Sequence, residues 1–124
     1  APPSPQRGDV PDGAPPGASR IILIVEDDAP FAEILQSLCR DMGFDALIAG
    51  TASAALELAA SRRPSAILLD VGLPDTSGLA LLEQLKRNPV TRPIPVHVVS
   101  IDDYTQVAQE LGAVGYALKP VSRE

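Results

Sequence analysis

The amino-acid sequence predicts an α/β domain in which helices cover both faces of a parallel sheet. From Arg20 onward, short apolar runs alternate with segments of helical periodicity, which is the pattern of repeated strand and helix units. The first apolar run is continuous rather than alternating, as expected for a strand that is buried on both faces. The composition agrees, because 45% of the 124 residues are hydrophobic and 21% are charged, as is ordinary for a single globular domain.

The first nineteen residues have a different composition. Half of residues 1–18 are Pro or Gly, and Val10 is the only sizeable aliphatic residue among them. Such a segment cannot bury enough apolar surface to offset the entropy lost on ordering. We therefore expect residues 1–19 to be a disordered Pro/Gly-rich linker and residues 20–124 to form the folded domain.

The first strand and helix have clear boundaries in the sequence. We predict a strand at Ile21–Val25 and a helix from about Pro30 to Met42. Asp28 lies where an N-cap is expected, Pro30 falls in the first turn, and Gly43 ends the helix. Apolar residues recur at helical spacing and predict one buried face, formed by Phe31, Ile34, Leu35, Leu38, Cys39 and Met42.

The same unit recurs along the rest of the chain. We expect further strands at 45–49, 66–69, 94–99 and 114–118, and further helices near 52–62, 79–87 and 104–111. A flavodoxin-like doubly wound sheet with the strand order 2-1-3-4-5 would accommodate these five strands. Only four residues follow Pro120, too few for a fifth helix. We expect one apolar face to be bare and to be covered by a second copy in a homodimer or by an adjoining domain.

Acidic, hydroxyl and amine side chains follow the ends of four predicted strands. In chain order they are Glu26, Asp27 and Asp28, then Asp70, Ser100 and Lys119. Ligands of an open parallel sheet bind beyond the carboxyl ends of its strands. If the first and third strands are neighbours, Glu26, Asp27 and Asp70 converge and repel one another unless a cation lies among them. Mg²⁺ fits, because it binds one or two carboxylates together with water and phosphate oxygens.

This set of groups is suited to phosphoryl transfer. A carboxylate such as Asp70 can attack phosphorus once the charge on the transferring oxygens is neutralised. Lys119 would place a point charge on the phosphoryl oxygens, and Ser100 would donate a hydrogen bond to them. This interpretation depends on the acids and the lysine all lying at the ends of parallel strands. Taken singly, Asp28 is a helix cap and Asp70 could be a turn residue.

The order and spacing of four motifs resemble those of the receiver domains of two-component response regulators over residues 20–120: ILIVEDD, LLDVGLPDTSG, PVHVVS and GYALKP. The resemblance implies that Asp70 is phosphorylated and that Glu26 and Asp27 bind Mg²⁺. It also implies a further metal ligand in the backbone carbonyl of Gly72 and contact between Lys119 and the phosphoryl group. Ser100 and Tyr116 would form the conformational switch, although Tyr116 could equally be ordinary core packing.

The same resemblance implies the partners and the kind of activity. The phosphoryl donor would be a histidine kinase or a histidine phosphotransfer protein, and the chain would promote only its own phosphorylation rather than act as an enzyme. The run IPVHVVSIDD is most similar to receivers of hybrid sensor histidine kinases. Ile101 replaces the small residue usual in the family, and we expect it to slow the loss of the phosphoryl group.

Charge and composition exclude other classes of partner. A formal net charge of −6 argues against nucleic acid or an anionic membrane as the partner, because either would need a concentrated basic face. No apolar run is long enough to cross a bilayer, and we expect a cytoplasmic protein. Cys39 is the only cysteine, so no internal disulfide can form and we expect it in the core.

Three other functions remain to be weighed. A receiver-like interaction module could keep the fold and work without phosphorylation. A phosphatase with an aspartyl nucleophile would normally carry a second acid two residues after the first, where this chain has Gly72. A nucleotide-binding flavodoxin-like protein is disfavoured because no glycine-rich phosphate loop follows the first strand.

His97 lies between valines and is better explained as a sheet residue than as a phosphohistidine.

Overall fold

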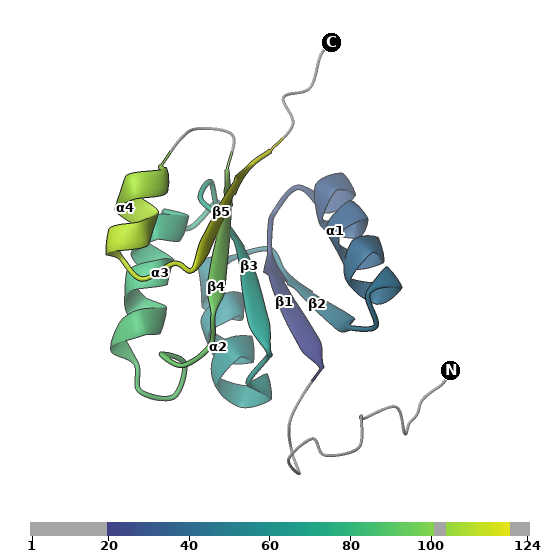
Figure 1. Cartoon of the computed structure of the whole chain (residues 1–124), viewed down its shortest axis with the longest axis horizontal. Helices are drawn as coiled ribbons and strands as arrows, with labels where there is room; N and C mark the ends of the chain where they lie inside the picture. The colour runs from purple at the N-terminus through teal and green to yellow at the C-terminus, as the bar shows by residue number, and fades with distance from the viewer. Residues whose placement is uncertain (1–19, 101–103, 120–124) are drawn as a thin grey trace.

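The computed structural model describes residues 20–100 and 104–119, and the expected linker at 1–19 lies outside them. Within that part of the chain, five strands and four helices alternate (Figure 1). The strands are β1 (Ile21–Val25), β2 (Asp45–Ala49), β3 (Ala66–Asp70), β4 (Val96–Ser100) and β5 (Gly115–Leu118). The helices are α1 (Ala29–Asp41), α2 (Ala52–Arg62), α3 (Gly78–Arg87) and α4 (Thr105–Glu110).

All strand pairs are parallel and the order is β2-β1-β3-β4-β5, which confirms the predicted flavodoxin-like sheet. The register pairs Val25 with Leu69 and Asp70 with Val99. Ser100 pairs with Leu118. The carboxyl ends of β1, β3, β4 and β5 therefore lie along one edge of the sheet.

The helices begin where short polar side chains cap them. Asp28 Oδ1 accepts a hydrogen bond from the Phe31 amide at 3.3 Å, as predicted for the N-cap of α1. Thr51 caps α2 in the same way, with its Oγ1 3.2 Å from the Ala54 amide nitrogen. Gly43 follows α1 with a φ of 91°, a conformation that glycine adopts without a steric penalty.

The fourth strand begins two residues later than predicted and includes Ser100. Pro93 and Pro95 have no amide hydrogen for a strand ladder, and the Ile94 amide donates to the Thr91 carbonyl in a turn. The strand therefore starts at Val96, the first residue after the prolines.

Two apolar layers enclose the sheet. In Figure 1, α1 lies on one side of the sheet and α2, α3 and α4 lie on the other. The larger layer packs α2, α3 and α4 against the sheet, and the smaller layer packs α1 against β1 and β2. Cys39 is buried in the smaller layer, as expected, and burial raises the pKa of its thiol.

The predicted buried face of α1 is only partly correct. Ile34, Leu38 and Met42 are 56%, 53% and 71% exposed, respectively. The helix packs against β1 and β2. On the same side of the sheet, next to the helix, an apolar cavity of about 480 Å³ lies over the neighbouring strands and is not filled by the described residues. Its lining includes Ile22, Cys39, Met42, Phe44, Leu68 and His97. This is the bare face expected from the sequence, and the described residues contain no fifth helix to cover it.

None of the described helices combines the length and the apolar character required to cross a bilayer.

Candidate functional site

Three carboxylates meet at the carboxyl edge of the sheet. Glu26 follows β1 directly and is 3% exposed, and Asp70 ends β3 and is 6% exposed. Asp27 lies beside them with its side chain open to solvent. One oxygen from each of the three lies within 4.8 Å of the other two. The convergence expected from strand order is therefore present.

Backbone pairing fixes the position of this cluster. The Glu26 amide donates to the Ala49 carbonyl at 2.9 Å, so the end of β1 is tied to the end of β2. The Asp28 amide donates to Glu26 Oε2 at 3.1 Å, which orients that carboxylate. Asp28 itself serves as the cap of α1 rather than as a member of the cluster.

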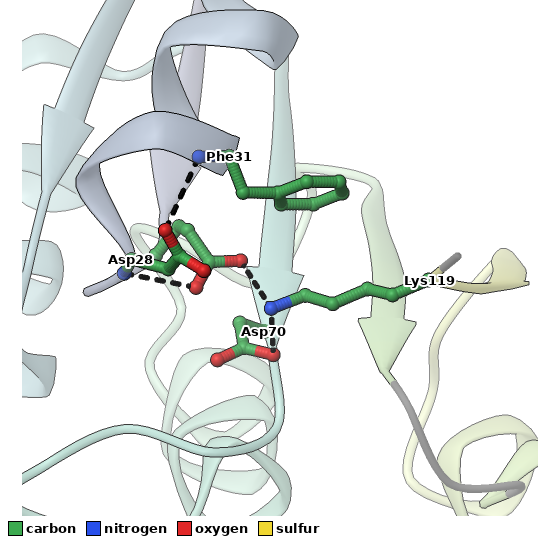
Figure 2. A network of polar contacts seen from close by, with 5 residues as sticks. Asp28, Phe31, Asp70 and Lys119 are labelled. Atoms are coloured by element: carbon green, nitrogen blue, oxygen red, sulfur yellow. Dashed lines mark hydrogen bonds and ion pairs between the residues drawn. The ribbon is translucent and has the colours of Figure 1, made fainter. Parts of the chain in front are cut away.

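Lys119 neutralises part of this negative charge. Its Nζ lies 2.7 Å from Glu26 Oε1 and 3.1 Å from Asp70 Oδ1, as the dashed lines in Figure 2 show. Burial alone would lower the pKa of Lys119, but the two carboxylates outweigh it and the pKa is raised. Burial raises the pKa of Glu26 despite the hydrogen bond from Lys119. The ammonium is therefore held firmly in its charged form.

Phe31 covers the lysine from the first turn of α1. The ring centroid lies 4.8 Å from Lys119 Nζ, and Figure 2 shows the ring beside the lysine chain. A cation at this distance from an aromatic ring is attracted to the ring face. The helical periodicity placed Phe31 only on the predicted buried face of α1 and did not predict this contact.

A polar cavity of about 320 Å³ opens over these groups. Ser100 is buried in its lining at 4% exposure, and Gly72 lines it from the loop after β3. The lining residues are Glu26, Asp27, Asp28, Asp70, Val71, Gly72, Ser100, Tyr104 and Lys119. Every residue predicted from the sequence for the metal or the phosphoryl group is among them.

Tyr116 lies apart from this cavity. It is half-buried on β5, and its hydroxyl accepts a hydrogen bond from the backbone amide of Tyr104 at the start of α4. The predicted switch role of Ser100 and Tyr116 stays a prediction. Ile101, expected to slow phosphoryl loss, lies outside the described residues.

The loop between β3 and α3 returns closely onto Asp70. The Gly78 amide donates to the Val71 carbonyl at 2.7 Å, and Gly72 and Ser77 form an isolated bridge. A Cβ added to Gly78 would lie 2.2 Å from the Asp70 carbonyl oxygen and 2.7 Å from Val71 Cα. Glycine is therefore required at position 78 for this loop to close.

The cluster suits a hard divalent cation. Its donor atoms are all carboxylate oxygens, the ligand type that Mg²⁺ prefers, and the nearby Gly72 could add a carbonyl oxygen. Lys119 supplies one positive charge against three carboxylates, so negative charge remains to be balanced. The residues present therefore fit a magnesium ion.

Comparison with known proteins identifies the family. The family model described as the response regulator receiver domain matches residues 22–124. Among curated proteins, the phosphate regulon transcriptional regulatory protein PhoB of Pseudomonas aeruginosa is 36% identical over 106 residues, which cover 83% of this chain and 46% of PhoB. The chain thus spans about half the length of this relative.

Solved structures give the same result. A sensor protein from Polaromonas sp. JS666 superposes with a TM-score of 0.76 at 33% identity, covering 82% of this chain and 85% of that one. The Mn²⁺-bound form of response regulator Rcp1 superposes with a TM-score of 0.74 at 26% identity, covering 82% of each chain.

Proposed function

The chain belongs to the response regulator receiver family of two-component signalling, and we propose that it accepts a phosphoryl group on Asp70 from a phosphohistidine donor. The observation that carries the proposal is the meeting of Glu26, Asp27 and Asp70 within 4.8 Å beside the largely covered side chain of Lys119. Like charges this close repel one another, and such a cluster in a cavity beside a lysine is suited to binding a cation together with an anionic substrate.

Glu26, Asp27, Asp70 and the carbonyl of Gly72 would hold Mg²⁺. When bound, this ion would neutralise charge on the transferring oxygens, so that the negatively charged carboxylate of Asp70 can attack the negatively charged phosphoryl group. The likeness to a Mn²⁺-bound response regulator supports a divalent ion in a fold of this kind.

In the transfer step, a carboxylate oxygen of Asp70 forms a bond to phosphorus while the phosphorus–nitrogen bond of the donor breaks. The electron pair of that bond stays on the donor imidazole, whose nitrogen takes up a proton from solvent. Lys119 moves from pairing the carboxylates to contacting the phosphoryl oxygens, and the Ser100 hydroxyl donates to one of them. The product is an aspartyl-phosphate and an unmodified histidine.

The switch would follow from the new charge. Ser100 would turn toward the phosphoryl group, and Tyr116 would move with it and change the surface near α4 and β5. The hydrogen bond from the Tyr104 amide to Tyr116 supports a coupling between β5 and α4. A histidine kinase or histidine phosphotransfer protein as partner belongs to this proposal, as does a cytoplasmic location; the link to a hybrid kinase stays a prediction.

The test is phosphorylation with Mg²⁺ and acetyl phosphate, followed by intact mass. The parent chain should gain one phosphoryl group, whereas Asp70→Asn should gain none. Asp27→Asn is the matched control for the metal, because it leaves Asp70 intact and should lose phosphorylation through weaker Mg²⁺ binding. An Asp70→Asn variant that is phosphorylated like the parent would rule out Asp70. A parent that binds Mg²⁺ but is never phosphorylated, even by a histidine donor, would favour the interaction-module alternative.

A further inference from the structure

Asp75 lies in the loop between β3 and α3 and binds the start of another helix. Its Oδ1 accepts a hydrogen bond from the Ala52 amide at 2.9 Å, and its Oδ2 accepts one from the Ser53 amide at 3.2 Å. Ala52 and Ser53 begin α2, which already has a cap of its own in Thr51. Asp75 is thus a second cap, supplied from a distant segment of the chain.

These bonds connect two segments that each adjoin the proposed metal site. On one side, the Glu26 amide donates to Ala49, which lies three residues before Ala52. On the other side, the loop that contains Asp75 begins at Asp70 and includes Gly72. Asp75 therefore ties the loop carrying Gly72 to the same segment that holds Glu26.

Gly72 is not paired within the five-stranded sheet. It lies two residues beyond the end of β3 and is exposed, so strand pairing does not hold it. The bonds of Gly78 to Val71 and the bridge from Gly72 to Ser77 close the loop on itself, and neither reaches the segment that binds Glu26. Among the interactions described for this loop, the two Asp75 bonds reach the β2–α2 segment.

We propose that Asp75 is a positioning residue that fastens the β3–α3 loop to α2 and thereby sets the Gly72 carbonyl for Mg²⁺ binding. The inference rests on the proposed function, because it concerns the same metal. It extends that function to a residue that touches neither the metal nor the phosphoryl group. The hydrogen bond from Ala52 lowers the pKa of Asp75, consistent with a carboxylate that works in its charged form.

The alternative is that Asp75 only stabilises α2. Thr51→Ala separates the two, because it removes the cap bond to Ala54 from the same helix end and leaves the loop untouched. The measurement is Mg²⁺ affinity, from amide shifts of Gly72 and its neighbours during titration with MgCl₂. Urea unfolding in EDTA gives the loss of stability in each variant.

Asp75→Ala should weaken Mg²⁺ binding about tenfold, the usual scale for residues that orient metal ligands, whereas Thr51→Ala should change it by less than about twofold. Asp75→Asn keeps one carbonyl acceptor and should fall between Asp75→Ala and the parent. This conservative variant also serves as the test if Asp75→Ala fails to fold.

Equal Mg²⁺ affinity in Asp75→Ala and the parent would overturn the inference. So would an equal loss in Asp75→Ala and Thr51→Ala, which would make Asp75 a helix cap alone. A parent chain that binds no Mg²⁺ would overturn the proposed metal site itself, so the two failures are distinguishable.

Discussion

The ammonium of Lys119 lies 2.7 Å from Glu26 Oε1, and the two side chains are only 11% and 2% exposed, respectively. The same ammonium reaches Asp70 Oδ1 at 3.1 Å. Among the described residues, Lys119 is therefore the cation that compensates the acids at the edge of the sheet. A buried charge that loses its partner destabilises a fold by about 3–5 kcal/mol.

Lys119→Met should lower the free energy of unfolding of the metal-free chain by about 3 kcal/mol, because the apolar part of the side chain is kept while the positive charge is lost. Urea unfolding in EDTA measures the change. Adding MgCl₂ should stabilise the variant more than the parent, since the ion then takes over the role of the ammonium. Equal unfolding midpoints for both chains in EDTA would contradict this account.

Glu26→Gln should have the opposite effect on stability, raising the free energy of unfolding in EDTA by about 1 kcal/mol at neutral pH, because one buried negative charge is removed while Lys119 keeps Asp70 as its partner. Folding raises the pKa of Glu26 above its ordinary value of 4.5, mainly because the carboxyl is buried. The protonated carboxyl therefore contributes its full stability below pH 4.5, and this contribution is lost as pH rises through the pKa of the folded chain. The gain should therefore disappear below about pH 4.5. The same variant should bind Mg²⁺ less tightly than the parent. Glu26 would then lower the stability of the fold while it contributes to Mg²⁺ binding.

The fold was predictable because its signals are local. Continuous apolar runs marked the strands, and caps such as Asp28 marked the helix starts, within one or two residues. The edge cluster followed from topology, because parallel strands place their carboxyl ends together. Helical periodicity, however, shows only that α1 is amphipathic and not how much of it is covered. The exposure of Ile34, Leu38 and Met42 could not be read from it.

Two contacts at the site left no signal in the sequence. Phe31 follows β1 and Lys119 follows β5, and the two residues meet only because the parallel sheet places the carboxyl ends of its strands along one edge. Asp75 accepts hydrogen bonds from amides that lie 22 and 23 residues earlier in the chain. In the sequence it cannot be distinguished from an acidic residue that only occupies a turn. Contacts of this kind depend on packing between elements, which local patterns do not contain.

Phe31→Leu tests the contact between the aromatic ring and the lysine. The substitution keeps an apolar side chain at the first turn of α1 but removes the ring face near Lys119 Nζ. In a double-mutant cycle with Lys119→Met, the coupling between the two positions should be about 0.5–1 kcal/mol. Additive unfolding free energies would show that the ring only packs against the lysine chain.

Gly78→Ala should destabilise the chain by about 1–3 kcal/mol, because the new methyl group would overlap the Asp70 carbonyl and the Val71 backbone. It should also weaken Mg²⁺ binding, since the loop can relieve the overlap only by moving Gly72. Gly50→Ala is the matched control: a Cβ there meets nothing within 4 Å. Thermal unfolding and Mg²⁺ titration compare the two. If both variants were equally stable, the close approach of Gly78 would be unimportant.

Tyr116→Phe should loosen the start of α4. This six-residue helix has no side-chain cap, and the hydroxyl of Tyr116 accepts the hydrogen bond of the Tyr104 amide at its first turn. Losing that bond should cost about 1 kcal/mol and speed hydrogen exchange at the Tyr104 amide. Tyr104→Phe is the control, because it removes a hydroxyl and keeps the backbone amide.

If Ser100 and Tyr116 act as the proposed switch, beryllofluoride with Mg²⁺ should move the Tyr104 amide resonance in the parent and much less in Tyr116→Phe. The same shift in both chains would remove Tyr116 from the switch.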